Sequence, residues 1–197
     1  MGNVGIIGRA RVGKDTAGKW LVDNRGYRRV GFADALKEAA LKLDPIIDDG
    51  NVGYRFSAMR LSEVVGGYGW ERAKEIGDTR RILQELGSAM RAVDPDIWLR
   101  AALKKVQEAN DSGVPVVITD VRYPNEAESL RRAGFHLVYI ERPGVPQFDH
   151  ESEGALTGSD ADFHTVNDGA ISSLHTALEA VMEDIYAFES RRHYARL

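Results

Sequence analysis

One stretch near the N-terminus has the residue types and spacing that bind a polyphosphate. Gly8, Gly13 and Lys14 belong to a segment that nearly fits the pattern G-x4-G-K-[ST], between an apolar run that predicts a strand and a stretch that predicts a helix. Glycines let such a loop turn its backbone N–H groups and the helix N-terminus toward phosphates, and Lys14 adds a full positive charge. The segment therefore predicts a site for the phosphates of ATP; the alternative is a glycine turn that only caps a helix.

The next position departs from this pattern. Asp15 stands where the pattern has Ser or Thr, whose hydroxyl contacts magnesium in many phosphate-binding loops. Either Asp15 contacts the ion, directly or through water, or Thr16 takes that role. We therefore expect Mg²⁺ as a cofactor and ATP as a co-substrate, with both residues as candidate ligands.

A second group of chemical residues follows the apolar run at 114–119. Asp120 and Arg122 are two residues apart, so in an extended chain their side chains project to the same side, about 6.6 Å apart. Ligands of open parallel sheets bind at the carboxyl ends of the strands. Asp120 could there hold hydrated magnesium or orient an acceptor, while Arg122 binds phosphate. The plainer alternative is a structural Asp–Arg pair beside the turn at Pro124.

Two faces of the helix predicted at 78–93 differ in character. The apolar face consists of Ile82, Leu83, Leu86, Ala89, Met90 and Val93. The opposite face carries Arg80, Gln84, Ser88 and Arg91. Such a polar stripe often faces only water, but guanidinium and amide groups also suit an acceptor phosphate and a base. Arg142, which follows a predicted strand and opens the Pro- and Gly-containing segment 142–160, is a candidate lid arginine that would stabilise a transferring phosphoryl group.

The elements predicted around these residues alternate between strand and helix. Strands are expected at 3–8, 27–32, 114–119, 135–140 and 162–166. Helices are expected after the glycine-rich loop, after a proposed N-cap at Asp34, at 78–93, 98–109 and 125–133, and after the last strand. Segment 46–77 has no clear period and is predicted as loop plus short helix. This order predicts an α/β fold of three layers, with a five-stranded parallel sheet and helices on both faces.

Composition narrows the class of protein. With 197 residues, 43 % of them apolar, we expect one domain over 1–197, with a helical insertion at about 34–98 and a lid at about 142–160. There is no cysteine, which excludes disulfides and thiolate chemistry and suits the cytoplasm. The net charge of −4 argues against nucleic-acid binding. No apolar stretch approaches the roughly 20 residues needed to cross a membrane.

Six segments of the chain, taken in order, resemble the phage-type deoxynucleoside monophosphate kinases of the P-loop nucleoside monophosphate kinase superfamily. They are the loop ending Gly13-Lys14-Asp15-Thr16, the segment 31–37, the helix from 83 through 91, Asp94-Pro95-Asp96-Ile97-Trp98, the segment 120–126, and Asn167-Asp168-Gly169. Together they cover most of the chain and leave 46–77 and the lid unmatched.

The resemblance implies ATP- and Mg²⁺-dependent phosphate transfer to a deoxynucleoside monophosphate, on a P-loop kinase fold. It implies that the acceptor side is lined by Arg11, Lys37, Gln84, Arg91, Trp98, Asp120, Arg122 and Glu126. It also places Asn167 near the adenine of ATP. Glu126 equally suits the first turn of a helix, and Lys37 equally suits a helix surface. Dimerisation would be in keeping with the family, and a phage origin would mean the host cytoplasm.

Two other functions fit the same residues. The Gly-Lys-Asp departure also suits kinases of other small phosphorylated metabolites, of the phosphomevalonate or dephospho-coenzyme A type. A nucleotide-dependent switch that hydrolyses ATP slowly without transfer would need the loop but neither Arg122 nor the polar stripe. Turnover with different acceptors distinguishes all three.

Overall fold

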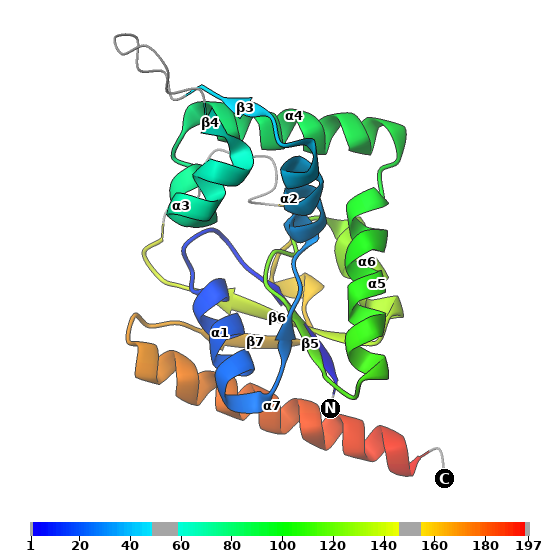
Figure 1. Cartoon of the computed structure of the whole chain (residues 1–197). Helices are drawn as coiled ribbons and strands as arrows, with labels where there is room; N and C mark the ends of the chain where they lie inside the picture. The colour runs from blue at the N-terminus through cyan, green and yellow to red at the C-terminus, as the bar shows by residue number, and fades with distance from the viewer. Residues whose placement is uncertain (1, 49–58, 146–154, 196–197) are drawn as a thin grey trace. The chain divides into compact units, whose positions relative to one another are not determined.

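The computed structural model describes residues 2–48, 59–145 and 155–195, and they fall into two compact units. One unit combines the chain up to Gly31 with the chain from Leu103 onward. The other unit is Phe32–Ala102. Figure 1 shows the elements of both.

The first unit is built on a five-stranded sheet in the order β2-β5-β1-β6-β7, and all its neighbouring strands are parallel. The strands are β1 (Asn3–Ile7), β2 (Arg28–Arg29), β5 (Val116–Ile118), β6 (Phe135–Glu141) and β7 (Phe163–Val166). This confirms the five parallel strands predicted from the sequence. The second is shorter than expected because Phe32 already begins a helix.

Helices cover both faces of this sheet. The helices are α1 (Lys14–Arg25), α5 (Ile97–Asp111) and α6 (Pro124–Arg132), and α5 belongs to this unit from Leu103 onward. Right-handed crossovers put α1 on one face of the sheet and α5 and α6 on the other. The long C-terminal helix α7 (Ile171–Tyr194) shares the α1 face (Figure 1). The main core lies between the sheet and the helices α1 and α7. It includes Val4, Ile6, Val138, Ile140, Trp20, Leu21, Leu174, Leu178, Met182 and Ile185.

The start of α1 packs unusually closely on the end of β5. A Cβ atom at Gly18 would lie 2.3 Å from Cγ2 of Thr119, a distance that real contacts do not allow. Thr119 is buried, with 2 % of its surface exposed, and its branched side chain has little freedom to move aside. Glycine at position 18 therefore sets the distance between helix and sheet at the end where the phosphate-binding loop lies.

Among the residues that the structure describes, the second unit is helical with one small hairpin. Its helices are α2 (Phe32–Leu43), α3 (Leu61–Ala73), α4 (Gly77–Val93) and the first residues of α5, and its strands are β3 (Ile46–Ile47) and β4 (Met59–Arg60), paired antiparallel. Asp34 lies within the first turn of α2, so the prediction that it caps the helix was wrong. The short helix predicted within 46–77 corresponds to α3, which has 13 residues. The hairpin was not predicted, because short paired strands carry little periodic signal.

Ile82, Leu83 and Leu86 of α4 pack against the core of this unit, as predicted, but the buried face differs at other positions. Ala89 and Val93, expected in the core, are exposed, whereas Thr79 and Gly87 are buried. The cause is the packing of α2 on α4: a Cβ atom at Gly87 would lie 3.3 Å from Cδ2 of Leu36. Glycine thus provides the contact point that a pattern of large apolar residues cannot indicate.

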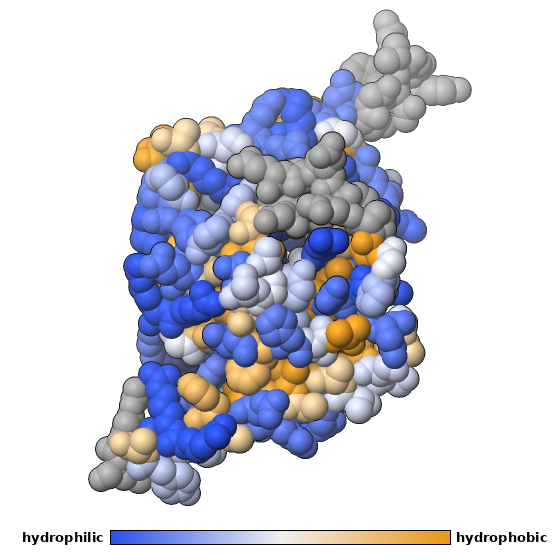
Figure 2. All heavy atoms as spheres, turned by 180° about the vertical axis from the view of Figure 1, so that it is seen from behind, coloured by the Kyte–Doolittle hydropathy of each residue, from blue (hydrophilic) through white to orange (hydrophobic). Residues whose placement is uncertain are grey.

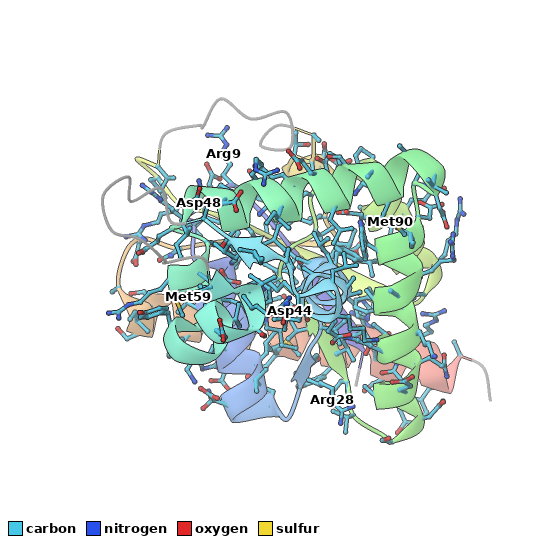
Figure 3. All side chains as sticks on the ribbon, turned by 45° about the horizontal axis from the view of Figure 1, so that its top comes forward. Arg9, Arg28, Asp44, Asp48, Met59 and Met90 are labelled. Carbon is cyan, nitrogen blue, oxygen red and sulfur yellow. The ribbon has the colours of Figure 1, made fainter. Side chains whose placement is uncertain are left out.

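Two aspartates, Asp44 and Asp78, bind backbone N–H groups at turns of this unit; Figure 3 labels Asp44 and Asp48, whose N–H binds Asp78. Asp44, in the left-handed region with φ 47°, accepts a hydrogen bond of 2.8 Å from the backbone N–H of Ser62, and this bond holds the pKa of its carboxyl below the usual range. Asp78 accepts one of 3.0 Å from the backbone N–H of Asp48, which lowers the pKa of Asp78 in the same way. Each carboxylate thus holds the backbone of a residue that is distant in the sequence.

No helix among the described residues is long and apolar enough to cross a bilayer. Figure 2 shows hydrophilic side chains over most of the face it presents, with apolar ones between them.

The close contact at Gly18 predicts an effect on stability. Gly18→Ala should lower the free energy of unfolding by about 1–3 kcal/mol, because the added methyl group overlaps Thr119. Gly66→Ala in α3, where a Cβ meets nothing within 4 Å, should leave stability unchanged or raise it by about 0.5–1 kcal/mol. Denaturant unfolding measures both; equal stability of Gly18→Ala and the wild type would contradict the packing described.

Candidate active site

The glycine-rich segment forms a tight loop between β1 and α1, as predicted. Gly8 (φ 148°), Arg11 (φ 64°) and Gly13 (φ 107°) have positive φ, and Gly13 precedes the first residue of α1. A Cβ atom at Gly8 would lie 2.5 Å from the carbonyl oxygen of Ile140, so glycine is required there. Left-handed residues among right-handed ones turn successive N–H groups to one side, which makes an anion-binding hollow at the helix N-terminus.

Lys14 lies folded over this loop. Its Nζ donates to the carbonyl oxygens of Gly8 at 2.7 Å and Arg9 at 2.6 Å. The ammonium group is therefore held at the loop itself and does not extend into solvent. It lines a small pocket together with Ile7, Gly8, Ala10, Val121, Arg122 and Leu156. The predicted cations Lys14 and Arg122, far apart in sequence, thus share one pocket.

Asn167 clamps the loop from the end of β7. Its side chain is buried, with its Nδ2 donating to the carbonyl oxygen of Val12 at 2.8 Å and its Oδ1 accepting from the N–H of Gly169 at 3.1 Å. The same Nδ2 would lie 2.7 Å from a Cβ atom at Gly13. Asn167 is thus placed beside the loop as expected, but its amide supports the backbone; a contact with adenine stays a prediction.

The first turn of α1 is tied to the end of β5 by a hydrogen bond between side chains. Thr119 Oγ1 donates to Asp15 Oδ1 at 3.0 Å. Asp15 and Thr16 are exposed, Thr119 is buried, and Asp120 beyond it is half-buried. Sequence reasoning did not single out Thr119; the only signal was a hydroxyl at the end of an apolar run, directly before the predicted functional Asp120.

Glu126 has a structural role at the start of α6. Its Oε2 accepts hydrogen bonds from the backbone N–H groups of Arg122 at 2.8 Å and Tyr123 at 3.1 Å, and the residue is 9 % exposed. Glu126 therefore caps the helix and holds the loop that presents Arg122. This agrees with the alternative considered for it, and a direct contact with the acceptor stays a prediction.

The remaining predicted arginines of the first unit are exposed. Arg142 follows β6, and its Nη2 lies 3.7 Å from the Cβ position of Gly169, so its guanidinium is beside the turn between β7 and α7. Arg11 lies in the loop itself. Residues 146–154 of the predicted lid lie outside the described residues.

The predicted acceptor residues of the second unit fall into two groups. Arg80, Gln84 and Arg91 are exposed along α4, as their spacing indicated. Lys37 lies over the ring of Trp70 at 5.7 Å. Trp98 is buried, and its indole N–H donates to the carbonyl oxygen of Gly87 at 3.4 Å. Both side chains thus pack within the unit; acceptor contacts of all five stay predictions.

The residues fit a magnesium ion held mainly by the substrate. Among the residues that the structure describes, no three His, Asp or Glu side chains gather into a metal site. Mg²⁺ is commonly bound by one or two carboxylates together with substrate phosphates. Asp15, at the phosphate-binding helix end, and Asp120, at the end of β5, are carboxylates of this kind; Thr16 offers a hydroxyl.

Two roles for Asn167 predict different nucleotide selectivity. Because its amide supports the loop, Asn167→Ala should weaken ATP and GTP binding by similar factors and lower the free energy of unfolding by about 1–3 kcal/mol. The matched variant Asn24→Ala, whose exposed amide donates to Trp20 on α1, should leave nucleotide binding unchanged. Calorimetric titration with both nucleotides measures this. A loss confined to ATP would show that Asn167 instead reads the base.

Comparison with known proteins agrees with this geometry. Residues 71–178, more than half of the chain, match the model of the family described as deoxynucleotide monophosphate kinase. A protein of Acanthamoeba polyphaga mimivirus, named as a candidate deoxynucleotide monophosphate kinase, is 27 % identical over 190 residues, covering 92 % of this chain and 96 % of its own. The deoxynucleotide monophosphate kinase of Escherichia phage RB69 is 27 % identical over 139 residues, covering 62 % and 57 %.

Among solved structures, a dephospho-CoA kinase from Campylobacter jejuni superposes with a TM-score of 0.49 at 12 % identity, over 93 % of this chain and 97 % of its own. The family match confirms the resemblance read from the six sequence segments. The chain therefore belongs to the deoxynucleotide monophosphate kinase family of ATP-dependent phosphotransferases.

Proposed function

We propose that this chain transfers the γ-phosphate of ATP to a deoxynucleoside monophosphate, giving the deoxynucleoside diphosphate and ADP. The observation that carries the proposal is the pocket shared by Lys14, on the phosphate-binding loop, and Arg122, after β5. One cation suits the triphosphate of the donor and the other suits the phosphate of an acceptor. Family membership supports a nucleotide as that acceptor.

In the proposed reaction an oxygen of the acceptor phosphate attacks the γ-phosphorus, and the bond from that phosphorus to the β,γ-bridging oxygen breaks. Such a transfer depends on positioning and on charge, with little covalent chemistry for the protein. Lys14 exchanges its carbonyl partners on Gly8 and Arg9 for phosphate oxygens. Arg122 orients the acceptor phosphate, and Arg142 stabilises negative charge on the phosphoryl group. Bound Mg²⁺ would neutralise charge on the phosphates, held on the protein side by Asp15 and Asp120.

We further propose that the unit Phe32–Ala102 recognises the acceptor nucleoside through the exposed stripe on α4. This stripe offers the guanidinium groups of Arg80 and Arg91, which can donate to a base or a phosphate. It also offers the amide of Gln84, which can both donate to a base and accept from it. The proposed partners are thus ATP and a deoxynucleoside monophosphate, without nucleic acid, and a second copy of the chain in keeping with the family. The cytoplasm, of the host if the chain comes from a phage, is the proposed location.

The function is tested by a screen of acceptors. With ATP and Mg²⁺, ADP release should depend on added deoxynucleoside monophosphates and should match formation of the diphosphate. Lys14→Ala should slow turnover a few hundredfold, since one charge contact in the transition state contributes about 3 kcal/mol. Lys19→Ala, on the exposed side of the same helix, is the matched control. Turnover of phosphomevalonate or dephospho-coenzyme A with deoxynucleotides inert, or ADP release without any acceptor, would reject the proposal.

The role of Arg122 predicts a split between the two substrates. Arg122→Ala should lower kcat/KM for the acceptor about tenfold to a hundredfold, as expected for a charged hydrogen bond, while ATP affinity stays nearly unchanged. Arg132→Ala, which removes an exposed arginine at the end of α6 that pairs with Glu128, should alter neither. Steady-state kinetics with each substrate varied in turn measures this; loss of ATP affinity alone would assign Arg122 to the donor.

A further inference from the structure

The hydrogen bond between α1 and β5 joins the two positions at which P-loop proteins hold magnesium. In the general arrangement the loop supplies a Ser or Thr hydroxyl and the end of a neighbouring strand supplies an Asp carboxylate. Here Asp15 stands on the loop side, and Thr119 follows β5 directly before Asp120. The bond of 3.0 Å between Thr119 Oγ1 and Asp15 Oδ1 keeps the pairing of a hydroxyl with a carboxylate.

The packing around Thr119 fixes the direction of its hydroxyl. Thr119 is 2 % exposed, and its Cγ2 occupies the space where Gly18 lacks a side chain. A threonine held by its methyl group cannot rotate freely about χ1. The hydroxyl is thus directed at Asp15 by tertiary packing, while Asp15 itself is exposed at the first turn of α1.

Charge gives this arrangement a consequence for nucleotide binding. Asp15 directly follows Lys14, so its carboxylate lies at the helix end that is built to receive phosphates. A carboxylate and a phosphate that lie close together repel each other unless a cation lies between them. The carboxylate is therefore unfavourable for a nucleotide without metal and favourable for a nucleotide bound with Mg²⁺.

We propose that Thr119 is a positioning residue that orients the Asp15 carboxylate toward the magnesium ion of the nucleotide. The inference rests on the proposed function, because it takes a metal–nucleotide complex as the ligand of the loop. Thr119 does not touch the substrate; it acts through Asp15. In an extended chain Asp120 projects to the opposite side from Thr119, so the Thr119 hydroxyl acts on Asp15 and not on Asp120.

Two substitutions separate the hydroxyl from the packing. Thr119→Val keeps the branched shape and removes the hydroxyl, whereas Thr119→Ser keeps the hydroxyl and removes the methyl group. The affinity for ADP is measured by calorimetry with Mg²⁺ and with a chelator instead. In the wild type and in Thr119→Ser, Mg²⁺ should strengthen ADP binding. In Thr119→Val this gain should fall about tenfold, the usual effect of losing a group that orients a metal ligand, while metal-free affinity stays unchanged.

A double-mutant cycle tests whether the effect passes through Asp15. Asp15→Asn should bind metal-free ADP more tightly than the wild type, because the repulsion is gone, and should gain less from Mg²⁺. Adding Thr119→Val to Asp15→Asn should then change nothing further. The same Thr119→Val enzyme should need about tenfold more Mg²⁺ for half-maximal turnover at unchanged saturating kcat.

Several results would overturn the inference. Wild-type dependence on Mg²⁺ in Thr119→Val, equal losses in Thr119→Val and Thr119→Ser, or additive effects of Asp15→Asn and Thr119→Val would each do so. Thr119→Ala provides a second hydroxyl-free variant if valine unfolds the protein. If the wild type binds ADP with Mg²⁺ but phosphorylates no deoxynucleotide, the proposed function fails while the calorimetry still decides the role of Thr119.

Discussion

The structure of the site depends on one constraint, the sharp turn by which the chain leaves β1 and enters α1. Gly8 passes so close to the backbone of Ile140 that no side chain fits, and Gly13 turns the chain into the helix with φ 107°. The amide of Asn167 then bonds the carbonyl of Val12 from across the sheet. A loop held at both ends in this way presents its N–H groups before any phosphate arrives, so little ordering remains for binding.

Parallel strands explain why the functional residues of the first unit lie near one another. Lys14 follows β1, Thr119 and Arg122 follow β5, and Asn167 follows β7. Because every strand of the sheet runs in the same direction, these ends lie at one edge. Glu126 adds order there by bonding the backbone at Arg122. The edge is therefore a set of short loops, each between a strand of the sheet and the helix that follows it.

Several residues in and around the site make their described contacts with the protein itself. Gly18 lets α1 approach β5, and Thr119 fills the space beside Gly18 and donates a hydrogen bond to Asp15. The side chains of Asn167 and Glu126 form hydrogen bonds with backbone groups. In the second unit Trp98 and Lys37 likewise pack against their own unit. A motif match alone does not separate such supporting residues from those that contact ligand, since both occur at fixed positions along the chain.

The sequence by itself determined the alternation of parallel strands and helices along the chain, the phosphate-binding loop and the polar stripe of α4, because periodicity and glycine content are properties of neighbouring residues. It did not determine the hairpin β3–β4, the burial of Thr79 and Gly87, or the Asp15–Thr119 bond. Those features join residues far apart in the chain, 104 positions for the last pair. Only tertiary packing decides which distant side chains meet, and so which polar groups support the loop.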